Sequence, residues 1–199
     1  MTAFHTLAAR ARGIFVAPRV LSAAVVVGAS SGDGVLVVRD QKTRTWHGPA
    51  FYSVWGASFG LQVGAEASEV VVLVMTERGI AAMLKPGVRF GVDASIAVGP
   101  VGGGIGGATA NGSVDLVAFA RSKGLYGGVS LKGAVVAVQY ELNEAYYGRP
   151  TTPADIVVRG GGANLQGEQF LAAVQRVTRP SPGSDATAGP APPDSGPRP

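Results

Sequence analysis

The chain has 199 residues, of which 46% are apolar and 15% charged. This length suits one domain, and the apolar content is ample for one hydrophobic core. Cysteine is absent, which excludes disulfides, thiolate nucleophiles and thiolate metal sites. With two histidines, His5 and His47, the chain also lacks the residues for a histidine-rich metal site. We therefore expect no metal and no cofactor.

The net charge of +4 is concentrated at one end of the sequence. Residues 1–44 carry the whole excess, and the rest of the chain holds equal numbers of basic and acidic groups. The basic groups of this first segment are Arg10, Arg12, Arg19, Arg39, Lys42 and Arg44. A basic patch beside a neutral body indicates an anionic partner, and we expect phospholipid rather than nucleic acid. A solubilising edge explains the charge equally well.

Residues 4–15 predict an amphipathic helix. At helical spacing, Phe4, Leu7, Ile14 and Phe15 fall on one side, and Arg10 and Arg12 fall on the other. An interfacial helix needs this division, because its apolar side faces acyl chains and its basic side faces phosphates. A helix that packs on a sheet and exposes its arginines to water has the same pattern. Periodicity alone favours this second interpretation.

The body of the chain, about residues 14–150, is typical of successive strands. Residues 23–28 and 34–39 are Val-rich, and residues 29–33 between them predict a hairpin loop. Further strands are predicted at residues 58–65, 69–75, 91–99, 113–120 and 134–140, with a tight turn at Asn111-Gly112.

Helices are predicted mainly near the ends. Residues 76–85 predict one that Pro86 and Gly87 end, and Thr152 is placed to cap another that starts at Pro153. Residues 166–177 predict a third. We expect a single α+β domain over 1–177, with a mostly antiparallel, strongly curved or barrel-like sheet, an N-terminal amphipathic helix and short flanking helices. The Pro-rich residues 178–199 predict a disordered tail.

Two glycine motifs imitate catalytic or nucleotide-binding signatures. Residues 28–32 match G-x-S-x-G, but a nucleophile elbow at Ser30 needs a following helix and a later histidine, and the last histidine is His47. Residues 102–107 match G-x-G-x-x-G without the helix that a dinucleotide requires. The carboxylates show no spacing typical of a catalytic pair. We therefore expect no enzymatic activity.

Aromatic residues gather in one stretch of the sequence. The stretch contains Trp46, Phe51, Tyr52, Trp55 and Phe59. Such a group lines an apolar or lipid pocket in some proteins, but core packing is the more common role and the one favoured here. The sequence also predicts no transmembrane helix and no signal peptide at its start.

Several motifs resemble the SYLF domain family. Its opening is similar to residues 11–20 and 34–39, and its central motifs are similar to residues 46–52, 60–65, 91–95, 99–102 and 122–133. Asn143, Tyr146, Tyr147 and Gly148 close the match, which keeps the family's order over about residues 8–158. The resemblance implies a lipid-binding module that prefers phosphoinositides or other anionic lipids. Eukaryotic members are linked to membrane remodelling and actin, and many bacterial members are exported.

With this resemblance, the interfacial interpretation of the first helix becomes the favoured one. Arg10, Arg12 and Arg19 would then meet lipid phosphates, while Phe4, Leu7, Ile14 and Phe15 would enter the acyl boundary. Lys123 and Lys132 are weaker candidates. We expect peripheral membrane association, outside the cytoplasm if a signal precedes this sequence and inside it otherwise. The alternative is a cell-envelope structural or protein-interaction domain without lipid contact.

Overall fold

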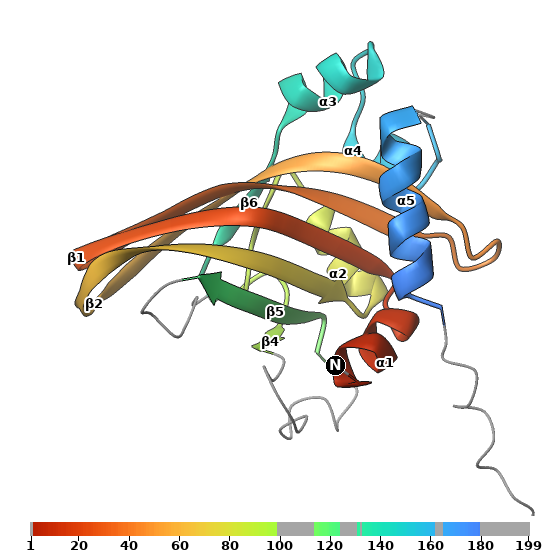
Figure 1. Cartoon of the computed structure of the whole chain (residues 1–199). Helices are drawn as coiled ribbons and strands as arrows, with labels where there is room; N and C mark the ends of the chain where they lie inside the picture. Colours follow the sequence, from red (N-terminus) through yellow and green to blue (C-terminus); the bar gives the residue numbers. More distant parts are fainter. Residues whose placement is uncertain (1, 99–113, 124–130, 132, 162–164, 180–199) are drawn as a thin grey trace, which may run out of the picture.

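The computed structural model describes residues 2–98, 114–123, 131, 133–161 and 165–179, and its fold is a curled sheet with short helices on both faces (Figure 1). The elements are α1 (Thr2–Arg10), β1 (Gly13–Arg39), β2 (Trp46–Val74), α2 (Glu77–Met83), β3 (Gly87–Arg89), β4 (Ile96–Val98), β5 (Leu116–Lys123), β6 (Val135–Val138), α3 (Tyr140–Tyr147), α4 (Pro153–Val157) and α5 (Leu165–Val177).

The sheet has six strands in the order β3-β6-β2-β5-β4, and β1 pairs with β2 off this path. All strand pairs are antiparallel except β4 with β5. The predicted fold class is thus confirmed: the chain is α+β, and its mostly antiparallel sheet curls into a half-barrel.

A single long hairpin, β1 with β2, makes up most of the sheet. Figure 1 shows it running away from α1, bending and returning, so that the two ends of β1 lie side by side. The backbone N–H of Arg39 donates to the carbonyl of Arg12 across this junction at 2.8 Å. At Gly32, an added Cβ would lie 2.5 Å from the carbonyl oxygen of Arg19. Only glycine allows the two halves of β1 to approach this closely.

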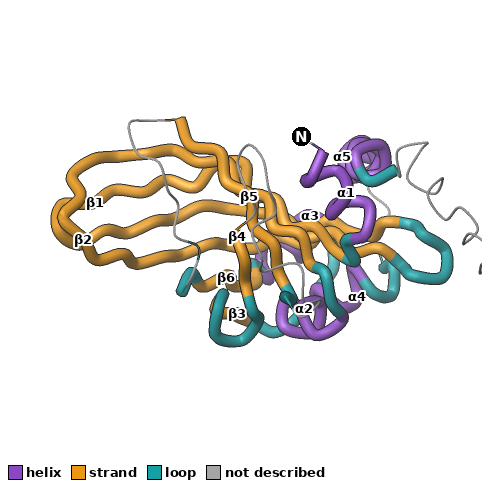
Figure 2. The backbone as a smooth tube through the Cα atoms, turned by 90° about the horizontal axis from the view of Figure 1, so that it is seen from below, coloured by secondary structure: helices purple, strands orange, loops and turns teal. Residues whose placement is uncertain are grey.

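Side chains on the strands alternate between two cores, as the period of two requires. On β1, Phe15, Leu36 and Val38 point to the inner core, whereas Ile14 and Val37 point to the outer core. The inner core is covered by α2 and α4, and the outer core by α1 and α5. Figure 2 shows these two pairs of helices on opposite sides of the strands. Where these helices pack on the ends of β1 and β2, both faces of the sheet are therefore buried.

The three helices predicted after residue 75 are confirmed. Thr76 caps α2, accepting a hydrogen bond from the N–H of Gly79 at 2.9 Å. Thr152 and Asp155 form a reciprocal capping box at α4, with Pro153 in its first turn. The helix predicted at residues 166–177 is α5. The sequence analysis does not predict helix α3, whose start at Gln139 has no side-chain capping hydrogen bond to signal it.

The prediction of separate strands at residues 23–28 and 34–39 is wrong. Residues 29–33 lie within β1, paired with residues 53–57 of β2, and they form no loop. The strands expected at 58–65 and 69–75 are likewise parts of β2. The real hairpin turn is at residues 40–45, where Asp40 accepts from the backbone N–H groups of Lys42 and Thr43. Ser30 therefore sits in mid-strand, without the geometry of a nucleophile elbow.

The extent of the first helix was also predicted wrongly. The helix ends at Arg10, and Gly13 already starts β1. The backbone N–H of Arg12 donates to the carbonyl of Val74 at 2.8 Å, so strand pairing replaces the next helical turn. Ile14 and Phe15 consequently point to opposite faces of the sheet instead of sharing one helical face.

Several expectations fall outside the described residues. They concern the turn at Asn111-Gly112, the glycine motif at residues 102–107 and the tail from residue 180. Thr178, at the start of the predicted tail, is described and buried, and its hydroxyl donates to the carbonyl of Val174 at 2.8 Å.

We predict that Gly34→Ala destabilises the fold by about 1–3 kcal/mol, the usual cost of overpacking a core. The new Cβ would lie 2.7 Å from Cε2 of Phe15 and 2.9 Å from the carbonyl oxygen of Val16. Phe15 is 1% exposed and has no room to move. The matched control is Gly87→Ala on edge strand β3, where the nearest atom is 3.9 Å away. Equal denaturation midpoints for the two variants would contradict the close approach.

Candidate anion-binding site

A groove of about 440 Å³ opens where the end of α1, the hairpin turn and the start of α2 meet. Its lining includes four arginines, Arg10, Arg12, Arg39 and Arg44, together with Thr76, Gln41 and five apolar residues. No Asp or Glu lines it among the described residues. We call this feature the arginine groove. Its charge and size suit an anion as large as a phosphorylated headgroup.

Backbone hydrogen bonds bring the four arginines together from distant parts of the sequence. Arg10 ends α1, and Arg12 is held between Val74 and Arg39 by its backbone N–H and carbonyl. Arg39 ends β1. Arg44 lies in the hairpin turn with a φ of 62°, and its N–H donates to the carbonyl of Asp40 at 2.9 Å. The doubled-back hairpin is therefore what assembles the groove.

Arg39 is the unusual member of the groove because it is 6% exposed and has no carboxylate partner among the described residues. Its Nη1 donates to the carbonyl of Ala9 at 3.0 Å, and its guanidinium lies 5.4 Å from the ring centroid of Trp46. Its Nε is buried without a hydrogen-bond partner. Burial, followed by the charges of Arg44 and Arg12, lowers the pKa of Arg39. Such an uncompensated cation is costly to a fold, and sites of this kind are candidates for ligand binding.

Of the four groove arginines, Arg12 is the one that pairs with an acidic side chain in the described part of the chain. Its Nη1 lies 2.9 Å from Oε1 of Glu77, on the first turn of α2. The Glu77 side chain is 83% exposed and that of Arg12 33% exposed. The other three arginines form no ion pair with any described residue.

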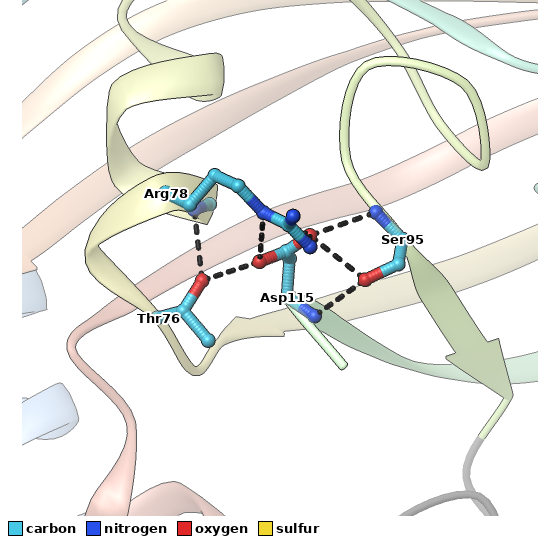
Figure 3. Close-up of polar contacts among 5 residues, drawn as sticks. Thr76, Arg78, Ser95 and Asp115 are labelled. Carbon is cyan, nitrogen blue, oxygen red and sulfur yellow. Dashed lines mark hydrogen bonds and ion pairs between the residues drawn. The ribbon is translucent and has the colours of Figure 1, made fainter. Parts of the chain in front are cut away.

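A second polar cluster, centred on Asp115, includes Thr76, one of the residues that line the groove (Figure 3). The Asp115 carboxylate accepts from Thr76 Oγ1 at 2.6 Å, from Arg78 Nη2 at 2.7 Å and from Ser95 Oγ at 2.8 Å. Burial by itself would raise the pKa of Asp115, but these hydrogen bonds outweigh it and hold the pKa well below its ordinary value. The carboxylate is fully engaged within the chain, so the cluster ties α2 to β5.

The structure separates the residues that the sequence assigned to lipid contact. Arg10 and Arg12 meet in the groove, but Arg19 is exposed elsewhere on β1. Leu7 and Ile14 are buried in the outer core, with Phe4 packed against it, and Phe15 is buried in the inner core. The expectation of a shared apolar face is therefore wrong for the folded chain. Lys132 lies outside the described residues, as does the side chain of Lys123.

Sequence reasoning missed Arg39 and Arg44 as site residues. The signal was present in the charge count, because both belong to the basic excess of residues 1–44. The count could not show that β1 doubles back and returns Arg39 to the end of the first helix.

The aromatic stretch does not form one cluster. Trp46 and Tyr52 are buried, on the outer and the inner core respectively, whereas Trp55 is 56% exposed. The predicted core role therefore holds for Trp46 and Tyr52 and is wrong for Trp55. The Phe59 side chain lies outside the described residues. No described helix combines the length and apolarity needed to cross a bilayer.

Comparison with known proteins identifies the family. The family described as "Ysc84: Las17-binding protein actin regulator" matches residues 55–177, more than half of the sequence. The chain belongs to the Ysc84 family. The resemblance to SYLF domains is thereby confirmed.

Named relatives of this family are longer proteins. SH3 domain-containing YSC84-like protein 1 of Xenopus laevis is 32% identical over 143 residues, 71% of this chain and 42% of the relative. Its human counterpart is 30% identical over 151 residues, 75% and 44% of the two chains. LAS seventeen-binding protein 3 of Saccharomyces cerevisiae (strain ATCC 204508 / S288c) is 30% identical over 155 residues, 76% and 33%. The chain thus spans less than half the length of these relatives.

We predict that Asp115→Asn lowers the free energy of unfolding by about 2–3 kcal/mol at neutral pH, since it weakens several charge-assisted hydrogen bonds. Because the folded pKa lies below the unfolded value of about 3.9, this contribution is complete above that value and is lost as the pH falls further. The stability of the variant should therefore fall less steeply in acid. Denaturation across pH checks this, with the exposed Asp93→Asn as control. An unchanged acid slope would contradict the role of Asp115.

Proposed function

We propose that this Ysc84-family chain is a non-enzymatic module that docks on anionic membranes, with phosphoinositide-like headgroups as the preferred contact. The convergence of Arg10, Arg12, Arg39 and Arg44 in one groove carries the proposal. Phosphate oxygens accept paired hydrogen bonds from guanidinium groups, so arginines suit lipid phosphates better than lysines do. Arg19, on an open part of β1, would add attraction without belonging to the groove.

In this proposal the docked form of α1 binds through its polar side. Leu7 is 7% exposed and packs in the outer core, so the apolar side of α1 is already occupied. Contact of Phe4 and Leu7 with acyl chains would require α1 to leave the sheet and expose that core. Ile14 and Phe15 belong to β1 and could not follow without unpairing it from β2. Guanidinium groups therefore carry the proposed contact.

We predict that Arg10→Gln with Arg44→Gln weakens binding to anionic vesicles about 30-fold at low salt, since each basic group near such a surface contributes about 1 kcal/mol. Co-sedimentation with phosphatidylcholine vesicles, with and without phosphatidylserine or a phosphoinositide, measures this. High salt should reduce wild-type binding. The charge-matched control is Arg89→Gln with Arg121→Gln, two exposed arginines outside the groove. Equal losses in both double variants would point to net charge alone and contradict the groove.

A second variant tests whether α1 binds the membrane while packed on the sheet or after it has left the sheet. Phe119→Ala should lower stability by about 2–3 kcal/mol, less than the usual cost for a fully buried phenylalanine, and loosen α1 from the sheet, because Phe4 of α1 packs edge-to-face against Phe119 of β5. If the docked helix binds, the folded variant should bind anionic vesicles as the wild type does. Tighter binding at a temperature where circular dichroism shows the sheet intact would instead support release of α1.

The second candidate is a protein-interaction domain without lipid contact. The family description and the yeast relative's name both refer to binding of Las17. The outer face also presents Trp55 and Leu21 beyond the part that α1 and α5 cover, at 56% and 49% exposure. If the folded chain does not bind anionic vesicles at low salt, that result would favour this candidate over the first.

A further inference from the structure

We infer that the arginine groove is a discrete pocket for one phosphate group, with Arg39 at its centre, and that Glu77 is a built-in competitor which the incoming phosphate displaces from Arg12. The inference deepens the proposed function and rests on it for the membrane source of the phosphate. It adds a defined site and a residue that sets its affinity.

Arg39 is placed to hold a ligand and poorly placed to stabilise the fold. It is 6% exposed, its Nε has no partner, and no carboxylate neutralises it among the described residues. Arg44 and Arg12 lie near enough to disfavour its charge further. A bound phosphate would supply the missing negative charge to three guanidinium groups at once. Arg39 is among the residues that line the groove, together with Arg12 and Arg44.

Glu77 reaches the groove from its rim. It follows Thr76, which lines the groove, and its Oε1 lies 2.9 Å from Nη1 of Arg12. With 83% of its side chain exposed, Glu77 forms a surface ion pair, a kind of contact that contributes little to stability. The pair is therefore easily exchanged.

The exchange favours a phosphate for a geometric reason. The Glu77 carboxylate is fixed to α2 and forms an ion pair with Arg12, but it forms none with Arg39 or Arg44. A phosphate inside the groove can bond to several arginines together. Before it does so, Arg12 must give up Glu77, and this step weakens the observed affinity. The ion pair thus acts as a mild brake on anion binding.

The charge-removing variant Glu77→Gln tests the brake. We expect it to bind pyrophosphate, measured by calorimetry, about two- to fivefold more tightly than the wild type, the range that a surface ion pair allows. Glu141→Gln, an exposed glutamate on the first turn of α3, is the matched control and should leave affinity unchanged. No gain in Glu77→Gln would overturn the role of Glu77.

A double variant distinguishes competition from general repulsion. If Glu77 acts by occupying Arg12, replacing Glu77 with Gln should not raise pyrophosphate affinity when Arg12 has already been replaced by Gln. A gain that persists without Arg12 would mean that Glu77 only repels the ligand through space, and it would overturn the competitor.

Arg39 is tested by Arg39→Met, which keeps an unbranched side chain beside Trp46 and removes the buried charge. Replacing a poorly compensated buried charge by an apolar group is often neutral or stabilising, so the thermal midpoint should not fall. Pyrophosphate affinity should fall roughly tenfold or more. Unchanged affinity in this folded variant would overturn the central role of Arg39. If it fails to fold, Arg39→Lys replaces it, with the same expected loss because lysine lacks the bidentate fork.

Vesicles of phosphatidylcholine with phosphatidylserine or a phosphoinositide, compared with pyrophosphate, separate the two proposals. If the wild type binds pyrophosphate but not these vesicles, the membrane function fails, and the effect of Glu77→Gln still decides the pocket with a soluble phosphate as its ligand. If the wild type binds the vesicles but not pyrophosphate, vesicle binding by Glu77→Gln and Arg39→Met decides the pocket, with the same gain and loss of affinity expected. Binding of neither probe overturns both proposals.

Discussion

The doubled-back hairpin is the constraint on which the other features depend. Because β1 bends and returns, its first and last residues become neighbours, and Arg39 donates its backbone N–H to Arg12. Gly32 permits the close approach, since a side chain there would meet the carbonyl of Arg19. Because side chains alternate between the two faces of the strands, this one strand pair also supplies both cores. Without the return of β1, the arginines at its two ends would stand a strand's length apart.

Arg39 shows where stability and function diverge in this fold. A core position beside Trp46 would ordinarily hold an apolar side chain, and a buried cation without a countercharge is costly. Asp115 offers the contrast, since its buried charge has donors from Thr76, Arg78 and Ser95 and leaves nothing for a ligand. Arg39 thus has a hydrogen-bond donor without an acceptor, whereas the Asp115 carboxylate has all the donors it needs. Of these two polar sites, the groove and not the Asp115 cluster therefore has bonding capacity left over.

The local elements could be predicted from the sequence wherever the signal was local. Thr76 and Thr152 cap helices because a hydroxyl can satisfy N–H groups two or three residues ahead. Long-range pairing left no such signal. Residues 29–33 have the glycine and serine composition of a turn, yet they continue β1 because β2 supplies partners along its whole length. Ile14 and Phe15 fit a helix by spacing, but pairing with β2 imposed a period of two.

The same limit explains which site residues could be predicted. The excess of positive charge in residues 1–44 already indicated an anionic partner, and Arg10 and Arg12 lie in the groove. The apolar residues that the sequence assigned to a membrane are packed inside the folded chain, because an amphipathic pattern does not say what its apolar side will contact. Here a sheet offers Val37, Leu73 and Val117 at the outer core, and α1 packs against them. With that side occupied, the charged side of α1 remains available, and the recognition that we propose for the folded chain is electrostatic and hydrogen-bonded instead of apolar.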